Sequence, residues 1–235
     1  MTLEDFSNGF DTLLNSYAVN GTATVALDEY EKSFFLTKAQ EEMVVNLYSG
    51  NNSYGDSFEN TEEMRRNLSN LVSEANLSPI TGDKSFQGFI GVSDSSEFFQ
   101  LPEDLLFITY EEAQVTSKKC GKNIGIDVYP ATQDEYHRIK RNPFRGVNSR
   151  RALRLDLSDN VVEIISNSPI RSYYLKYVKK PEPIILINLP DGLTINNVRV
   201  KTPCKLNESI HQKILDRAVV LALQSKVSTD ATKNS

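Results

Sequence analysis

Residues 150–189 constrain the fold most, because they hold the densest strand signal in the chain. Within 152–158, Leu153, Leu155 and Leu157 alternate with small or polar residues. A period of two residues is typical of a half-buried strand, with one apolar and one polar face. The pattern therefore predicts a strand over 152–158.

Asp159 and Asn160 follow this strand and favour a turn, since both side chains bond nearby backbone and Asn tolerates positive φ. Residues 161–165 then return as a second strand. A two-residue loop places the apolar side chains of both strands on one face. The expected cross-strand pairs are Leu157 with Val162 and Leu155 with Ile164.

A third strand is expected over 171–179, which is rich in Tyr and β-branched residues. Pro181 and Pro183 end it, because proline cannot donate to a ladder. Residues 184–189 form a short apolar run next to these prolines, which favours a buried strand over a helix.

Composition restricts the class of protein. The 235 residues are 39% hydrophobic, enough for a core, and no apolar run approaches the ~20 residues of a membrane span. Two cysteines do not make a disulfide framework. We therefore expect a soluble protein made in a cytoplasm. Net charge is −5, but residues 1–80 hold thirteen acids and four bases, so the remainder is positive. Such asymmetry indicates two faces that meet different partners, or each other.

Helices are expected at both ends of the chain. The spacing of apolar residues predicts helices over 2–18, from a capping box at Thr37 to Gly50, over 60–75, and after Asn207. The remaining expectations are strands over 86–92 and 105–115, an exposed basic turn over 118–122, and a short helix over 134–140 capped by Thr132.

These elements predict an α+β protein with N-terminal helices, a mainly antiparallel sheet over about 85–201, and a C-terminal helix packed on the sheet. We expect an acidic helical region over 1–80, an α+β core over 81–226, and a flexible tail over 227–235.

The strongest charge pattern is an arginine-rich segment, 138–154, that contains no acidic residue. Arginine forks match phosphate geometry, so the segment could bind nucleic acid. The acidic net charge and the lone aromatic residue, Phe144, favour instead a protein interface with an acidic surface. The six candidate contact residues are Arg138, Arg141, Arg145, Arg150, Arg151 and Arg154.

Catalytic and metal signals are weak. His137 and His211 are the only histidines, and neither has a partnered nucleophile in sequence. Together with Cys120 and Cys204 they lack the spacing of a zinc site. Gly121-Lys122 lacks the upstream glycine and the following Ser/Thr of a P-loop. The sequence predicts no enzyme, cofactor or metal, although a dispersed enzyme site remains an alternative.

The order of segments resembles a known family. An arginine-containing hairpin segment over 142–165, a Tyr/Lys-rich strand closing in Lys-Lys-Pro over 173–181, and residues 203–214 leading into an Ala/Val/Leu helix resemble ring proteins of the neck of crAss-like bacteriophages. The resemblance covers roughly 99–226. It implies a structural head-to-tail connector subunit in a ring, a dodecamer around the DNA channel below the portal, with no catalytic residues to carry over.

This resemblance gives the charge pattern a use. In a closed ring, one face of a subunit meets a different face of the next, so one acidic and one basic region suit head-to-tail closure. We expect homo-oligomeric contacts, portal and other neck or tail proteins as partners, and no membrane. Reversing Arg150 and Arg151 to Glu is expected to prevent ring assembly in a folded monomer. The alternative is a DNA-binding or packaging accessory protein, in which these arginines touch packaged DNA.

Overall fold

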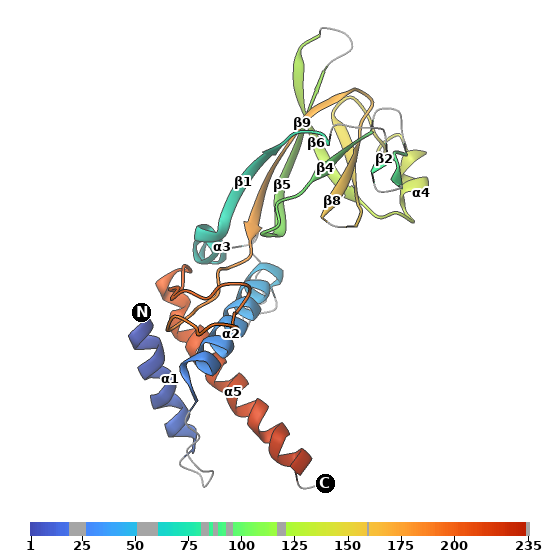
Figure 1. Cartoon of the computed structure of the whole chain (residues 1–235). Coiled ribbons are helices and arrows are strands. Elements are labelled where there is room, and N and C mark those ends of the chain that lie inside the picture. Colours follow the sequence, from blue (N-terminus) through green and yellow to red (C-terminus); the bar gives the residue numbers. More distant parts are fainter. Residues whose placement is uncertain are drawn as a thin grey trace. The chain divides into compact units, whose positions relative to one another are not determined.

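The computed structural model describes residues 1–18, 27–50, 61–80, 85–86, 89–92, 96–116, 121–158 and 160–233. The chain forms two compact units (Figure 1). The helical unit comprises Met1–Leu71 and Lys180–Ser235, and the sheet unit comprises Val72–Lys179. Among the described residues, every helix is too short or too polar to span a lipid bilayer.

The helical unit is built on three long helices, and α5 packs against α1 and α2 (Figure 1). Gly9 allows the close approach of α1 to α5, since an added Cβ would lie 2.8 Å from the side chain of Leu215. The elements are α1 Leu3–Ala18, α2 Glu29–Ser49, α3 Glu62–Leu68, η1 Ser69–Leu71, η2 Glu208–Ile210 and α5 His211–Lys233. The helix predicted over 2–18 is confirmed, and α5 continues through most of the expected tail.

Helix α2 begins eight residues before the predicted capping box. Asp28 is the N-cap and shares a capping box with Glu31, whereas Thr37 lies buried inside the helix. The predicted end is correct, because Gly50 adopts the left-handed conformation with φ 79°. The start was misplaced because a buried Thr followed by Gln can imitate a cap in sequence.

Within the apolar run over 184–189, residues 184–186 and 189 are buried, but the run is not a strand of the sheet. It belongs to the helical unit, where Ile185 forms an isolated antiparallel bridge with Thr202. On its other edge, the backbone of 182–186 bonds to side chains of α2. Side chains of α2 thus make the backbone hydrogen bonds that a neighbouring strand would make if this run were part of a sheet.

The sheet unit contains seven strands in the order β1-β9-β5-β6-β7-β8-β4. All neighbours are antiparallel except β6 and β7, so the mainly antiparallel sheet is confirmed. The strands are β1 Val72–Leu77, β4 Ser96–Gln100, β5 Leu105–Thr116, β6 Asn123–Ala131, β7 Arg151–Asp156, β8 Val161–Ile165 and β9 Ile170–Lys179, and β2 Ser85–Phe86 pairs separately with β3 Phe89–Ile90.

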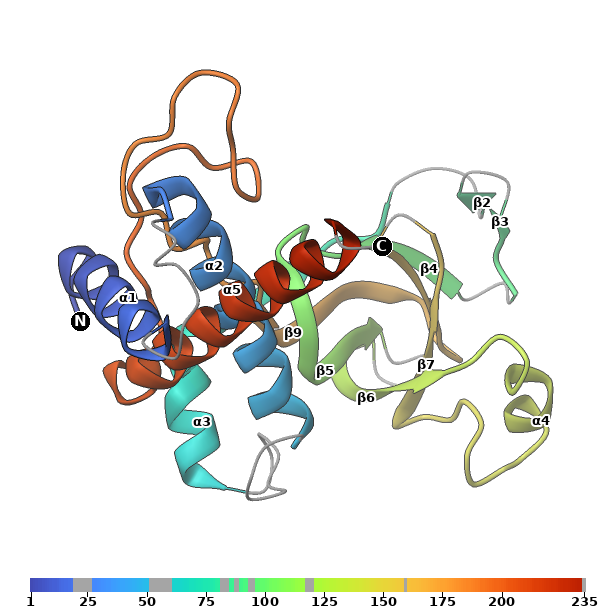
Figure 2. The same cartoon turned by 90° about the horizontal axis from the view of Figure 1, so that it is seen from below.

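The sheet curls on itself, as Figures 1 and 2 show, and β4 at one edge returns to contact β9. The rings of Phe99 on β4 and Tyr173 on β9 lie 5.5 Å apart between centroids, and both are fully buried. The curl therefore encloses one face of the sheet around a continuous core.

The predicted hairpin of β7 and β8 exists, but its register is shifted by one residue. Asp156 pairs with Val162, and Leu155 pairs with Glu163. Asn160 has φ 57°, as a turn residue there should, while Asp159 lies outside the described residues. All five residues of β8 are buried, so both faces are covered and apolar alternation could not specify the register.

Other elements depart from the prediction in smaller ways. The helix expected over 60–75 ends at Leu68, and Val72–Leu77 forms edge strand β1. The short helix after Thr132 is α4 Tyr136–Lys140, without a side-chain cap. The basic turn over 118–122 falls largely outside the described residues, which resume at 121.

The α+β class is confirmed, with N-terminal helices, the sheet and a C-terminal helix. Within the helical unit, α5 packs against α1 and α2, and its expected packing on the sheet remains a prediction. The domain boundaries expected at 80 and 226 remain a prediction. The two compact units meet in sequence at 71/72 and 179/180.

Candidate subunit-interface surfaces

The arginine-rich segment is anchored to the sheet unit by α4. Tyr136 is buried with Leu153, Leu155 and Ile165, which ties the short helix to β7 and β8. The Nζ of Lys140 lies 5.7 Å from the centroid of the Tyr136 ring. A buried aromatic anchor fixes the direction in which the following loop leaves the sheet.

Residues 142–146, here called the Phe144 loop, are held by hydrogen bonds of their own. The side-chain oxygen of Asn142 accepts from the backbone N–H groups of Phe144 and Arg145, at 2.9 and 3.2 Å. The Gly146 N–H donates to the Asn142 carbonyl at 2.7 Å. Arg151 Nη1 donates to the Phe144 carbonyl at 2.6 Å. The loop is therefore a closed turn with a fixed apex.

Four of the six predicted arginines are exposed: Arg138, Arg141, Arg145 and Arg150. Among the described residues, none of the four makes a salt bridge. Arg151 is half-buried and stacks on Tyr129, with its guanidinium carbon 4.4 Å from the ring centroid. The exposed guanidinium groups thus form a basic surface without salt bridges in the described part of the chain, although Arg138 lies close enough to Asp134 to interact with its charge.

Arg154, the sixth predicted residue, lies inside the sheet unit instead. Its guanidinium pairs with Glu111 on β5, and its Nε donates to Asp156 at 2.9 Å. Tyr173 donates to the other Glu111 oxygen at 2.6 Å. Only 11% of the Arg154 side chain and 10% of the Glu111 side chain are exposed. Arg154 is thus already paired within its own unit.

Burial sets the protonation of this cluster. Desolvation raises the pKa of the Glu111 carboxyl, and the attraction of Arg154 offsets this only in part. Desolvation and the Glu111 charge raise the pKa of the Tyr173 hydroxyl, which stays protonated and donates. Glu111, Arg154 and Tyr173 therefore form a buried charge network between strands.

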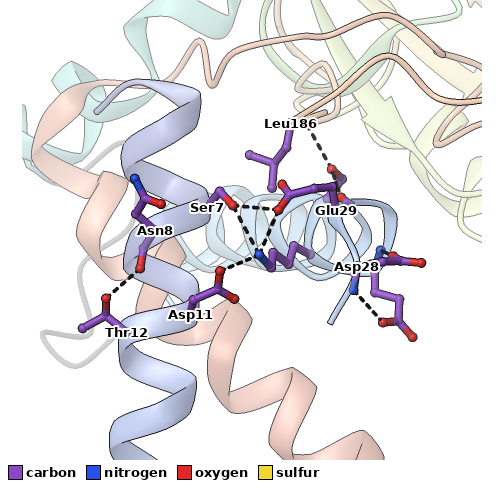
Figure 3. Close-up of polar contacts among 10 residues, drawn as sticks. Ser7, Asn8, Asp11, Thr12, Asp28, Glu29 and Leu186 are labelled. Atoms are coloured by element: carbon purple, nitrogen blue, oxygen red, sulfur yellow. Dashed lines mark hydrogen bonds and ion pairs between the residues drawn. The ribbon is translucent and has the colours of Figure 1, made fainter. Parts of the chain in front are cut away.

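The helical unit carries a polar cluster with an excess of negative charge, in contrast to the basic arginine surface of the sheet unit (Figure 3). Lys32 Nζ contacts Asp11 at 2.7 Å, Glu29 at 2.9 Å and Ser7 Oγ at 3.3 Å. Burial lowers the pKa of Lys32, but the hydrogen bonds to Asp11 and Glu29 outweigh it, so the pKa is raised and the ammonium persists. One cation faces two carboxylates, and the cluster keeps a surplus negative charge.

Beside this cluster lies a surface hollow of about 420 Å³, here called the α1–α2 hollow. Leu3, Leu186 and Ile187 supply apolar surface, and Glu4 and Glu29 supply carboxylates. Its remaining lining residues are Ser7, Asn8 and Lys201. The first turns of α1 and α2 add acidic residues nearby, Asp5 and Glu31.

Three of the four residues weighed for catalysis or zinc, His137, Cys204 and His211, are among the described residues. Among described residues, no group of three or more His, Cys, Asp and Glu side chains could hold a metal. His137 is exposed, and a ring nitrogen of buried His211 lies 3.0 Å from the Leu206 carbonyl oxygen. Cys204 donates to Gln40 at 3.2 Å, and Cys120 is outside the described residues.

Comparisons with known proteins agree over the whole chain. The family model described as phage tail ring protein 3/4 matches residues 1–234. Ring protein 3 of Bacteroides phage crAss001 is 47% identical over 236 residues, covering 99% of this chain and 100% of the relative. Ring protein 4/5 of the same phage is 34% identical over 237 residues, covering 94% and 92%.

These matches define the class: a structural ring protein of a crAss-like phage virion. Within that class, the chain belongs to the phage tail ring protein 3/4 family. The resemblance stated from the sequence is confirmed at the level of crAss-like ring proteins.

Sequence reasoning missed the α1–α2 hollow, because its lining comes from α1, α2 and residues 186–201, which only tertiary structure brings together. The acidic excess of residues 1–80 was the available signal. For Phe144, the signal was a lone aromatic residue in a run of arginines.

Proposed function

We propose that this protein is a non-enzymatic subunit of a homo-oligomeric ring in the virion neck, a head-to-tail connector below the portal. The observation that carries the proposal is the family match over residues 1–234. The ring is a dodecamer assembled from subunits made in the host bacterial cytoplasm, and its neighbours are the portal and other neck and tail proteins.

The charge distribution supports assembly through unlike surfaces. The helical unit holds acidic first turns on α1 and α2, and the sheet unit holds the exposed arginines of 138–151. A ring requires a heterologous contact between different patches of adjacent copies. Oppositely charged patches favour that contact and oppose pairing of like patches. Arg138, Arg141, Arg145, Arg150 and Arg151 contact an adjacent subunit or a neck neighbour.

Electron microscopy tests this proposal. Negative-stain images of the purified protein, alone and mixed with the portal, are expected to show rings. A map of the intact particle is expected to place the chain in the neck. If mixtures with portal and neck proteins give no rings, and the particle map places the chain elsewhere, the proposal is wrong.

Charge reversal then tests the arginine surface. Arg138→Glu with Arg150→Glu is expected to stop ring assembly without unfolding, since both side chains are exposed. Arg151 is kept, because it supports the Phe144 loop. Reversing the exposed pair Arg65 and Arg66 on α3 serves as the matched control, and equal defects in both variants would contradict an arginine-specific interface.

A second candidate places these arginines in the lumen, against packaged DNA. It is favoured by the four exposed guanidinium groups without salt bridges in the described chain. DNA binding then depends steeply on salt, through counterion release. In a filter-binding series over salt, a steep slope that the Arg138 and Arg150 reversal removes, with rings intact, supports this candidate.

A further inference from the structure

Phe144 is the most exposed large apolar side chain in the described part of the chain, with 85% of its surface open to solvent. In sequence, Phe144 lies between Arg141 and Arg145, and both of these are exposed. Scattered apolar residues are normal on a protein surface. An aromatic ring held at the apex of a fixed loop calls for a further explanation.

The Phe144 loop is built to hold that apex in place. Gly146 is buried, and an added Cβ would lie 2.8 Å from the Asn142 carbonyl oxygen and 3.1 Å from that of Ile139. The turn closes this tightly only with glycine. Together with the bonds from Asn142 and Arg151, this leaves the loop backbone little conformational freedom to lose on binding.

An aromatic ring on a fixed loop, flanked in sequence by arginines, has the composition of an interface hot spot. Such a group needs an apolar pocket for the ring and carboxylates at the rim for the guanidinium groups. Phosphodiester backbones would use the arginines but offer the ring no apolar pocket. The chemistry therefore favours a protein partner.

The helical unit carries a surface with these properties. The α1–α2 hollow has apolar lining from Leu3, Leu186 and Ile187, and Ile187 is 45% exposed. Glu4 and Glu29 stand at its lining, and Lys201 is the one lining cation among the described residues. The hollow is an open depression of about 420 Å³ with both polar and apolar lining, so it can receive one face of an aromatic side chain beside carboxylates.

We infer that the Phe144 loop of one copy seats in the α1–α2 hollow of the next copy. The ring of Phe144 contacts Ile187 and Leu3, and Arg141 and Arg145 face the acidic first turns of α1 and α2. The two patches are different surfaces of the same chain, so each contact leaves one patch of each kind open for the next subunit. This inference rests on the proposed ring function and names the contact that closes the ring.

Disulfide trapping tests it between separate chains. In a background with Cys120→Ser and Cys204→Ser, one protein carries Phe144→Cys and a second carries Ile187→Cys. The two are mixed, assembled with the portal where needed, and oxidised with copper phenanthroline. A covalent dimer on non-reducing gels is expected. Because each chain has one cysteine, that disulfide can form only between copies.

The matched control replaces Ile187→Cys with Tyr17→Cys. Tyr17 is 55% exposed but lies at the far end of α1 from Leu3, about 21 Å along the helix. The control pair is expected to give little dimer. Rings that assemble with no more Phe144–Ile187 dimer than the control gives would overturn the inference while leaving the ring function intact.

Loss of the ring side chain gives a second readout. Phe144→Ala is expected to weaken ring assembly about 30-fold, the size of a hot-spot loss. Ile90→Ala removes an equally exposed apolar side chain, 79% exposed, outside the loop and is expected to assemble normally. Thermal melts check that both variants fold.

Three outcomes overturn the inference in distinguishable ways. Normal ring assembly by Phe144→Ala overturns the contact alone. Intact rings with lost DNA binding in the same variant assign the loop to DNA. Absence of rings from wild-type protein under every condition, including mixtures with the portal, overturns the proposed function and this contact together.

Discussion

The Glu111–Arg154 pair of the sheet unit and the polar face of α2 in the helical unit show two different ways of satisfying buried polar groups. In the sheet unit, Arg154 and Glu111 neutralise each other as side chains. In the helical unit, Ser33, Thr37 and Gln40 form a polar stripe on one face of α2 and bond the backbone of residues 182–186. Paired charges depend on both partners staying ionised, whereas hydroxyl and amide bonds to backbone do not.

The difference shows how each unit is held together. The α2 stripe fastens an irregular segment to a helix, using hydrogen bonds of 2.7 to 3.1 Å where a sheet would use a ladder. The Glu111–Arg154 pair joins β5 to β7, which are not neighbours in the sheet because β6 lies between them. It therefore braces the curl of the sheet.

The largest predicted effect comes from breaking the charge pair. Arg154→Met leaves the Glu111 carboxyl buried without its cation, which is expected to cost ~3–5 kcal/mol of stability. Hydrogen exchange at β5, β7 and β9 amides, with urea denaturation, measures the loss. Arg150→Met, at an exposed arginine, is the control and is expected to change stability by less than ~0.5 kcal/mol.

This loss should depend on pH in a defined direction. Because the folded-state pKa of Glu111 is raised, the folded state binds the proton more tightly, and its contribution to stability falls as pH rises through that pKa. Removing Arg154 raises the pKa further. The penalty should be smaller at pH 4 than at pH 8, and a penalty independent of pH would contradict a role through charge.

Thr37→Val gives the next largest effect, now in the helical unit. The change keeps the shape but leaves the Ile184 N–H without its acceptor at 3.1 Å, and an unmet buried donor costs ~1–3 kcal/mol. Thr12→Val removes an exposed hydroxyl that bonds only the Asn8 carbonyl within α1 (Figure 3), so it is the matched control. Equal losses in both would show that the α2 stripe contributes no more than a surface hydroxyl.

Thr37 also shows where prediction from sequence reached its limit. The strands β7, β8 and β9 could be located because alternation and turn residues are local signals. The start of α2 could not be located from the sequence. Ser33, Thr37 and Gln40 are polar yet buried, and their hydrogen-bond partners lie about 150 residues away along the chain. Polar residues that are buried by hydrogen bonds to backbone cannot be recognised from the spacing of apolar residues in the sequence.

The candidate site divides in the same way. Its arginines could be predicted because their charges cluster along the chain. The salt bridge between Arg154 and Glu111 could not be predicted, because Glu111 is 43 residues earlier and the curl of the sheet brings the two together. Charge in sequence thus indicated a surface, and only packing distinguishes its exposed arginines from the structural one.

A smaller effect is expected at the true cap of α2. Asp28→Ala removes the acceptor for the Glu31 N–H at 2.7 Å and should cost about 1 kcal/mol. Asp28→Asn keeps an acceptor and should retain most of the stability. Thermal melts of the two variants give the comparison, and equal melting temperatures for Ala and Asn would show that the cap contributes nothing.

The smallest predicted effect is a loss of stability at low pH in the helical unit. Its direction is opposite to the pH dependence predicted for Glu111 in the sheet unit. Burial lowers the pKa of the His211 imidazole, so the unfolded chain binds its proton more readily. The stability that depends on neutral His211 is therefore present above its ordinary pKa and is lost as pH falls through that range. His211→Gln should flatten this decline between about pH 7.5 and 5.5, as followed by urea midpoints.

The same replacement at exposed His137 is the control. An unchanged slope in His211→Gln would mean that the acid sensitivity of the helical unit comes from its carboxylates, and the contrast with the charge-paired sheet unit would then disappear.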